Sequence, residues 1–172
     1  MGEAEVAELF QATMRLAASW TTPQVLRNYV GRSGSGIQPG QYQTPRTVGA
    51  AGPIRLRDLA DATAMTPGNA SKIVAELVDA GLVTRRVPRN DRRVTLIELT
   101  ESGRAAVERL DQVGRAMLEE RLSEFTAAEV DVLAALLVRL ADATTGWLRT
   151  LDAREDTKEE APARASAEGD AA

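Results

Sequence analysis

Apolar residues near the amino terminus recur at intervals of three and four. They lie between Glu3 and Trp20 and comprise Val6, Leu9, Phe10, Met14, Ala17 and Trp20. This spacing places them on one face and predicts an amphipathic helix. Three Thr-Pro pairs come later, and each has the chemistry of a helix start, with threonine as the N-cap and proline at the first helical position. The pairs are Thr22-Pro23, Thr44-Pro45 and Thr66-Pro67.

The first two pairs leave alternatives open. Pro23 starts a second helical segment that is either separate from the first helix or continuous with it through a kink, and the small residues of 31–36 predict a loop after it. A helix that began at Pro39 would be kinked at Pro45, at a cost of about 3 kcal/mol. A short helix that begins at Pro45 avoids this cost. Both versions end near Gly52.

The pattern changes between Ile54 and Thr100. Two short amphipathic stretches, Leu56–Met65 and Thr66–Ala80, predict a pair of helices joined by a turn, and Gly81 ends the second helix. The runs LVTRRV and RVTLIELT follow, and they flank the polar tip PRND. Such an arrangement is typical of a β-hairpin rather than of a further helix. The order of helix, turn, helix and hairpin is that of a winged helix-turn-helix.

Two longer helices are predicted after the hairpin. Thr100 caps the first, whose apolar face carries Val107, Leu110, Val113, Met117 and Leu122. Thr126 and Glu129 form a capping box at the start of the second. An apolar stripe then runs over about 25 residues, or about 38 Å of helix. Little of the chain remains to cover this stripe, which predicts a second subunit; packing on the N-terminal helix is the alternative. The stripe comprises Val130, Leu133, Leu137, Leu140, Thr144, Trp147 and Leu151.

These elements predict a mainly α fold with a small β-hairpin wing. Residues 1–36 form an N-terminal helical dimerisation segment, 37–100 the winged helix-turn-helix lobe, and 101–151 the C-terminal dimerisation helices. Residues 152–172 form an acidic tail, with no aliphatic side chain larger than alanine and with many charges. Such a segment cannot bury enough apolar surface to order itself, so we expect it to be disordered.

Composition narrows the function. Cysteine and histidine are absent, which removes disulfides, thiolate chemistry, Cys/His zinc sites and the commonest general base. No nucleophile–base pair stands out among the remaining residues, so we expect neither an enzyme nor a metal or cofactor site. The chain has no run of about 18 apolar residues and its first residues are acidic, which predicts a cytoplasmic protein.

The net charge of −4 is unevenly distributed along the chain. Residues 152–172 contain seven acids and three bases, so they carry all of this excess, and residues 1–151 are neutral overall. The ten residues 84–93 contain five arginines and one aspartate. A basic tip on a neutral body predicts docking on phosphates, because the local field matters more than the net charge.

The second helix of the motif carries candidate base-reading side chains. Its apolar residues fall on one side, and the polar residues Thr66, Asn69, Ser71 and Lys72 lie at or near the start of the other side. Asparagine can pair bidentately with adenine, and serine and lysine can contact bases or phosphates. A solvated surface helix has a similar polar face. The neighbouring hairpin favours DNA, because arginine enters narrow minor grooves and clamps phosphates. Its arginines are Arg85, Arg86, Arg89, Arg92 and Arg93.

Residues 37–103 resemble the DNA-binding core of the MarR family of bacterial transcriptional regulators. The resemblance rests on IVAELVDAGLVTR and on Asp91-Arg92-Arg93 followed by a strand and LTESG. It implies that Asp91 orients Arg93 for the minor groove and that the family's recognition-helix positions are Thr66, Asn69, Ser71 and Lys72. The chain departs from the family pattern at Ala64, Pro67 and Gly68. The resemblance also implies a dimer formed by the N- and C-terminal helices.

The hypothesis is a sequence-specific regulator that binds double-stranded DNA, acting as a ligand-responsive, homodimeric repressor on a pseudo-palindromic operator. The alternative is a winged-helix module that binds a protein partner without sequence-specific DNA binding. The resemblance further implies a small aromatic or anionic effector between the dimerisation helices and the lobe. Candidate contacts are Trp20, Tyr29, Tyr42 and Arg46, for which ordinary core packing is the alternative.

Overall fold

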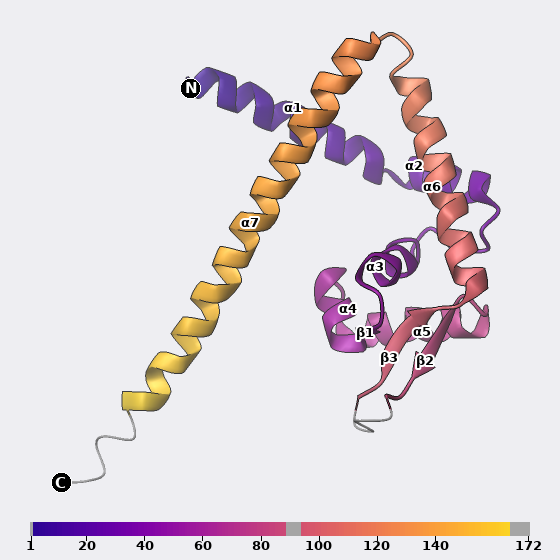
Figure 1. The fold of residues 1–172 in the computed structure, drawn as a ribbon, viewed down its shortest axis with the longest axis vertical. Helices are drawn as coiled ribbons and strands as arrows, with labels where there is room; N and C mark the ends of the chain where they lie inside the picture. The colour runs from indigo at the N-terminus through magenta and orange to yellow at the C-terminus, as the bar shows by residue number, and fades with distance from the viewer. Residues whose placement is uncertain (1, 89–93, 166–172) are drawn as a thin grey trace. The chain divides into compact units, whose positions relative to one another are not determined.

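The computed structural model describes residues 2–88 and 94–165, with side chains described as far as Trp147. It divides into two compact units, Met1–Glu120 and Arg121–Ala172, each of which is described by itself. Figure 1 labels the described elements. They are α1 (Glu3–Thr21), α2 (Pro23–Ser33), α3 (Gln43–Ala51), β1 (Ile54–Arg55), α4 (Leu56–Ala62), α5 (Pro67–Asp79), β2 (Val83–Arg86), β3 (Leu96–Leu99), α6 (Glu101–Arg121) and α7 (Ala127–Ala165).

The first two helices are separate. Thr22 has an extended backbone, with φ −62° and ψ 140°, and its hydroxyl accepts a hydrogen bond from the Val25 amide at 3.3 Å. This excludes the kinked alternative. α2 continues to Ser33, so the loop predicted from Gly31 begins only at Gly34, where φ is +54°. A left-handed backbone at that position suits glycine and ends the helix.

The prediction at Thr44-Pro45 was wrong in one respect. α3 begins at Gln43, so Thr44 lies buried inside the helix and is not its N-cap. Pro45 is the third helical residue, where its missing N–H removes no helical hydrogen bond. A turn precedes the helix, in which the Gln41 amide donates a hydrogen bond to the Gln38 carbonyl at 2.9 Å. This turn leads directly into α3 and sets its first residue at Gln43. The short-helix version of the prediction is therefore the closer one.

The helix-turn-helix has the predicted limits. α4 ends at Ala62, the turn passes through Ala64 with φ +51°, and α5 starts at Pro67. The Thr66 hydroxyl accepts a hydrogen bond from the Asn69 amide at 3.3 Å, as expected for an N-cap.

The wing is a three-stranded antiparallel sheet in the order β1-β3-β2. Strands β2 and β3 are the predicted hairpin, whereas β1 was not predicted. Ile54 pairs with Ile97 and Arg55 with Leu96. Two residues are too few to show the alternation by which a strand is recognised in a sequence.

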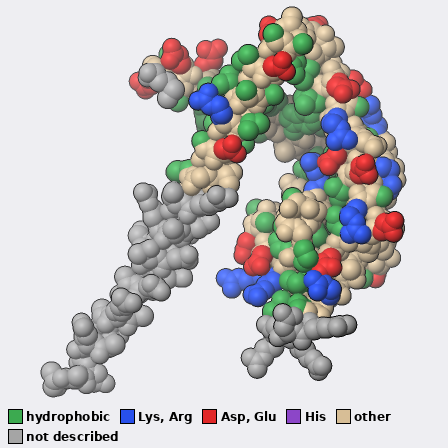
Figure 2. Space-filling view, viewed as in Figure 1, with side chains coloured by type: hydrophobic (Ala, Val, Ile, Leu, Met, Phe, Trp, Pro, Cys, Tyr) green, Lys and Arg blue, Asp and Glu red, His purple; other side chains and the backbone are tan. Residues whose placement is uncertain are grey.

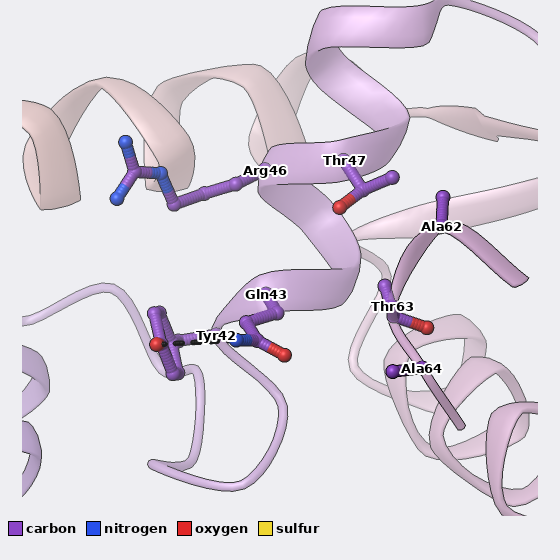
Figure 3. Close-up of a pocket in the computed structure, with 7 residues that line it drawn as sticks. All are labelled: Tyr42, Gln43, Arg46, Thr47, Ala62, Thr63 and Ala64. Atoms are coloured by element: carbon purple, nitrogen blue, oxygen red, sulfur yellow. Dashed lines mark hydrogen bonds between the residues drawn. The ribbon is translucent and has the colours of Figure 1, made fainter. Parts of the chain in front are cut away.

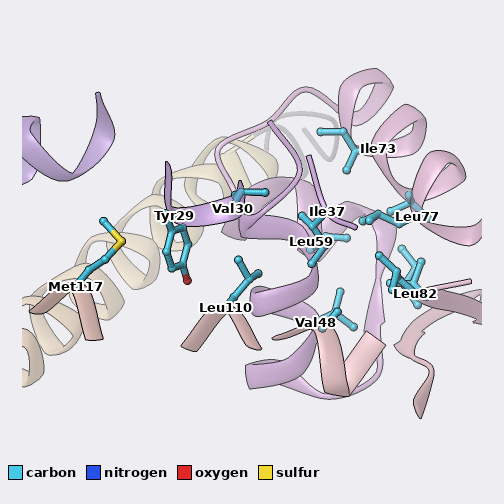
Figure 4. Packing of buried hydrophobic residues seen from close by; sticks show 14 residues of the cluster. Tyr29, Val30, Ile37, Val48, Leu59, Ile73, Leu77, Leu82, Leu110 and Met117 are labelled. Atoms are coloured by element: carbon cyan, nitrogen blue, oxygen red, sulfur yellow. The ribbon is translucent and has the colours of Figure 1, made fainter. Parts of the chain in front are cut away.

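One apolar core joins α2–α6 and the sheet within the first unit (Figure 4). Leu59 of α4, Leu77 of α5, Ile97 of β3 and Leu110 of α6 are almost completely buried in it. α6 is capped by the Thr100 hydroxyl, which accepts from the Gly103 amide at 2.9 Å. The core therefore holds α5 and the sheet as one body.

The second unit consists mainly of α7. The capping box is confirmed, because the Thr126 amide donates to the Glu129 carboxylate at 2.8 Å and the Glu129 amide donates to the Thr126 hydroxyl at 3.3 Å. The Glu129 carboxylate accepts hydrogen bonds from both the amide and the hydroxyl of Thr126, and these two bonds lower the pKa of Glu129. α7 continues to Ala165, which differs from the disorder predicted from residue 152 onward. Alanine, glutamate, lysine and arginine dominate 152–165, and all four favour helix. Residues 166–172 lie outside the described residues.

Candidate nucleic-acid interface

α5 has one buried side and one exposed side. Ala70, Ile73, Val74 and Leu77 are buried against the rest of the lobe. The predicted base-reading residues lie elsewhere on the helix: Asn69 and Lys72 are exposed, and Ser71 is half-buried. The core therefore fixes the rotation of α5 and leaves the amide and ammonium groups of these side chains toward solvent.

The start of α5 is its most accessible end. Thr66, Pro67, Gly68 and Asn69 are all exposed. The Thr66 oxygen already accepts the Asn69 amide, so this side chain acts first as a cap, and its hydroxyl hydrogen remains available to a phosphate. An added Cβ at Gly68 would meet nothing within 4 Å, so this turn presents little bulk to an approaching duplex.

The acidic residues of α5 lie farther along the helix. The Glu76 carboxylate accepts a hydrogen bond from Gln41 at 2.7 Å, which ties it to the loop before α3. Asp79 is the last residue of α5 and is exposed. The carboxylates of Glu76 and Asp79 would repel the phosphates of DNA. A duplex would therefore approach the helix by its start rather than along its full length.

The wing carries the basic charge. Figure 2 shows lysine and arginine side chains at the end of the first unit that bears the hairpin. Arg85 and Arg86 on β2 are exposed, and Arg86 forms an ion pair with Glu98 on β3. The predicted contacts Arg89, Asp91, Arg92 and Arg93 lie outside the described residues, and they stay predictions.

Three of the four predicted effector contacts lie together. The rings of Tyr29 and Tyr42 meet edge to face with centroids 6.0 Å apart. Arg46 donates to the Tyr29 hydroxyl at 3.2 Å and forms an ion pair with Asp111 at 3.3 Å. Burial raises the pKa of Tyr29 above its ordinary value, and the Arg46 cation opposes this rise. Tyr29 is therefore a neutral core residue near neutral pH. Trp20, on α1, is half-buried.

A cavity of about 450 Å³ lies between α3 and the turn after α4 (Figure 3). Tyr42 and Arg46 contribute to its wall, and their role as effector contacts stays a prediction. The position of the cavity was not predicted. The other lining residues are Gln43, Thr47, Ala62, Thr63 and Ala64. No sequence pattern points to these residues, because they come together only through the packing of α3 on the helix-turn-helix.

Other kinds of site find no support in the described part of the chain. It contains no group of three or more acidic side chains placed to hold a metal ion. None of its helices combines the length and the apolar character that crossing a bilayer requires.

Comparison with known proteins adds independent observations. The MarR family model matches residues 35–94. The HTH-type transcriptional regulator YwhA of Bacillus subtilis is 27% identical over 90 residues, which is 52% of this chain and 65% of YwhA, slightly less than two thirds of its length.

Solved structures extend the likeness to more of the chain. A MarR family protein from Bacillus stearothermophilus has a TM-score of 0.72 and 24% identity over 84% of this chain and 99% of its own. A probable transcriptional regulator from Pseudomonas aeruginosa is 30% identical, with a TM-score of 0.51, over 77% of this chain and 92% of its own.

The exposed start of α5, the basic hairpin beside it and these likenesses define a winged-helix DNA-binding protein. The chain belongs to the MarR family, and it is a DNA-binding transcriptional regulator.

Proposed function

We propose that the protein acts as a homodimeric repressor that occupies an operator with two related half-sites. One α5 enters the major groove of each half-site by its start, where Asn69 reads a base and Lys72 and Ser71 contact bases or phosphates. The hairpins lie over the flanking minor grooves. The observation that carries this proposal is the fixed rotation of α5, which buries four apolar residues and leaves Asn69 and Lys72 exposed.

Exposed apolar surface supports the homodimer. In the first unit, α1 buries no residue, and Leu9 and Phe10 are each 58% exposed. In the second unit, Leu137 and Trp147 of α7 are 46% and 58% exposed. Contiguous exposed apolar surface of this kind marks interaction sites. The family resemblance implies that these helices form the subunit interface.

The repressor is further proposed to respond to a small aromatic or anionic effector. Support comes from the cavity beside Tyr42 and Arg46. A ligand in this cavity would contact both α3 and the turn that connects α4 to α5, so it would change the position of α5 relative to the lobe. Arg46 offers a cation for a carboxylate, and Tyr42 offers an aromatic ring.

Titration of a protein–DNA complex with a series of aromatic carboxylates, starting with benzoate, tests the effector. We expect release of DNA from the wild type and weaker release from Arg46→Gln. Failure of every member of the series to release DNA from the wild type contradicts the effector proposal and leaves DNA binding unaffected.

Base reading by α5 is tested with a duplex of about 30 bp that the full-length chain selects from a random-sequence library, long enough for two half-sites one turn apart. We expect Asn69→Ala to lose about 1–3 kcal/mol of binding free energy on this duplex and little on a shuffled duplex of the same composition. Binding titrations on both duplexes provide the measurement. Equal losses on the two duplexes would refute base reading by Asn69.

A further inference from the structure

Two adjacent arginines of β2 lie on opposite faces of the wing. Arg85 pairs with Ile97 and Arg86 pairs with Leu96 across the β2–β3 ladder. Directly paired residues share a face of a sheet, and successive residues alternate between faces. Ile97 is buried in the core, so Arg85 lies on the face that is packed against the helices, and Arg86 lies on the outer face.

The cation of Arg86 is already satisfied within the sheet. Its Nε forms an ion pair with Glu98 on the neighbouring strand. Glu98 faces Thr84 in the same ladder, so both members of the pair lie on the outer face. A carboxylate this close cancels most of the field that Arg86 would present to a phosphate.

Arg85 has a different environment. Arg85 is exposed, and it forms no ion pair with any residue that the structure describes. It lines a crevice of about 220 Å³ together with Leu56, Val74, Thr95 and Ile97. Four elements meet there: Leu56 begins α4, Val74 belongs to α5 and Arg85 to β2, and Thr95 and Ile97 lie just before and in β3. Arg85 therefore stands where the wing meets the recognition helix.

The lining of this crevice suits the two parts of an arginine side chain. It is mostly apolar, so the aliphatic stem can cover it while the guanidinium group reaches solvent. A guanidinium group is planar and offers donors in a fixed fork that matches two phosphate oxygens. Its stem rests on packed core elements, which limits the entropy lost when the fork binds.

We propose that Arg85 is a phosphate-binding residue of the interface, which binds the DNA backbone where the hairpin meets the major-groove helix, and that Arg86 is a structural residue of the sheet. The proposal rests on the proposed function and assigns a separate role to each of two chemically identical neighbours.

The test compares Arg85→Gln with Arg86→Gln in the full-length chain on the selected duplex. Glutamine keeps part of the stem and removes the charge in both variants. For Arg85→Gln we expect the slope of log affinity against log salt to fall by about 0.9 for each bound subunit. The ratio of its dissociation constant to that of the wild type then falls about 3-fold per subunit between about 50 and about 200 mM salt. Arg86→Gln keeps the wild-type slope.

Arg85→Lys completes the design, because lysine keeps the charge and can still bind a phosphate as a point cation. We expect it to keep the wild-type slope. Equal slopes for Arg85→Gln and the wild type overturn the proposal, and so does an equal loss in both glutamine variants, which would mean that only the overall charge of the wing matters. If the wild type itself selects no duplex, the proposed function fails rather than the assignment of Arg85.

Discussion

At the scale of single residues, two glycines of α6 have very different surroundings. A Cβ added at Gly103 would lie 1.9 Å from the carbonyl oxygen of Leu82 and 2.9 Å from its carbonyl carbon. A Cβ added at Gly114 would have its nearest contact, the Tyr29 ring, at 3.5 Å. Only the first glycine is therefore required for close packing, and it holds α6 against the backbone that leads into β2.

We expect Gly103→Ala to lower the free energy of unfolding by about 1–3 kcal/mol or more, because backbone cannot yield as a flexible side chain does. Gly114→Ala in the same helix is the matched control, and it should change stability little or raise it by up to about 1 kcal/mol. Urea unfolding of both variants measures the difference. Equal stability of the two variants would show that the packing of α6 on Leu82 is not as described.

Residue roles that depend on local chemistry could be predicted from the sequence. Thr22, Thr66 and Thr100 cap helices because a hydroxyl and the amides it serves are close in the chain. Thr44 has the same Thr-Pro signature, yet the turn before α3 places it inside a helix. A count of arginines could not separate Arg85 from Arg86, because the ion pair with Glu98 depends on strand register.

At the scale of elements, the long periodic segments were the most predictable. The limits of α1, α4 and α5 and the start of α7 agree with the sequence pattern, because amphipathic spacing marks these helices and Thr66 and Thr126 cap α5 and α7. β1 was missed, since two residues owe their strand conformation to pairing with β3. The cavity beside Tyr42 could not be predicted from the sequence either, because its two walls are formed by separate segments of the chain. The exposed side of α5 was predictable, since apolar spacing defines which side is buried.

At the scale of the whole molecule, the distribution of charge and apolar surface favours assembly on DNA. The net charge of −4 comes from residues 152–172. The hairpin is locally basic although the net charge of the chain is negative. α1 and α7 each expose apolar side chains within their own unit. A regulator that pairs two recognition helices needs a dimer, and the spacing of its half-sites then follows from the geometry of B-DNA.

The proposed homodimer on a two-half-site operator is tested most directly by the composition and symmetry of the complex between the full-length protein and the duplex it selects. Mass analysis should find two chains on each duplex, and hydroxyl-radical footprinting should find two related protected half-sites with centres about 34–36 Å, or about 10 bp, apart. The shuffled duplex should give no such pattern. One chain per duplex, or the same affinity and protection on the shuffled duplex, would contradict a homodimer that reads DNA sequence through α5.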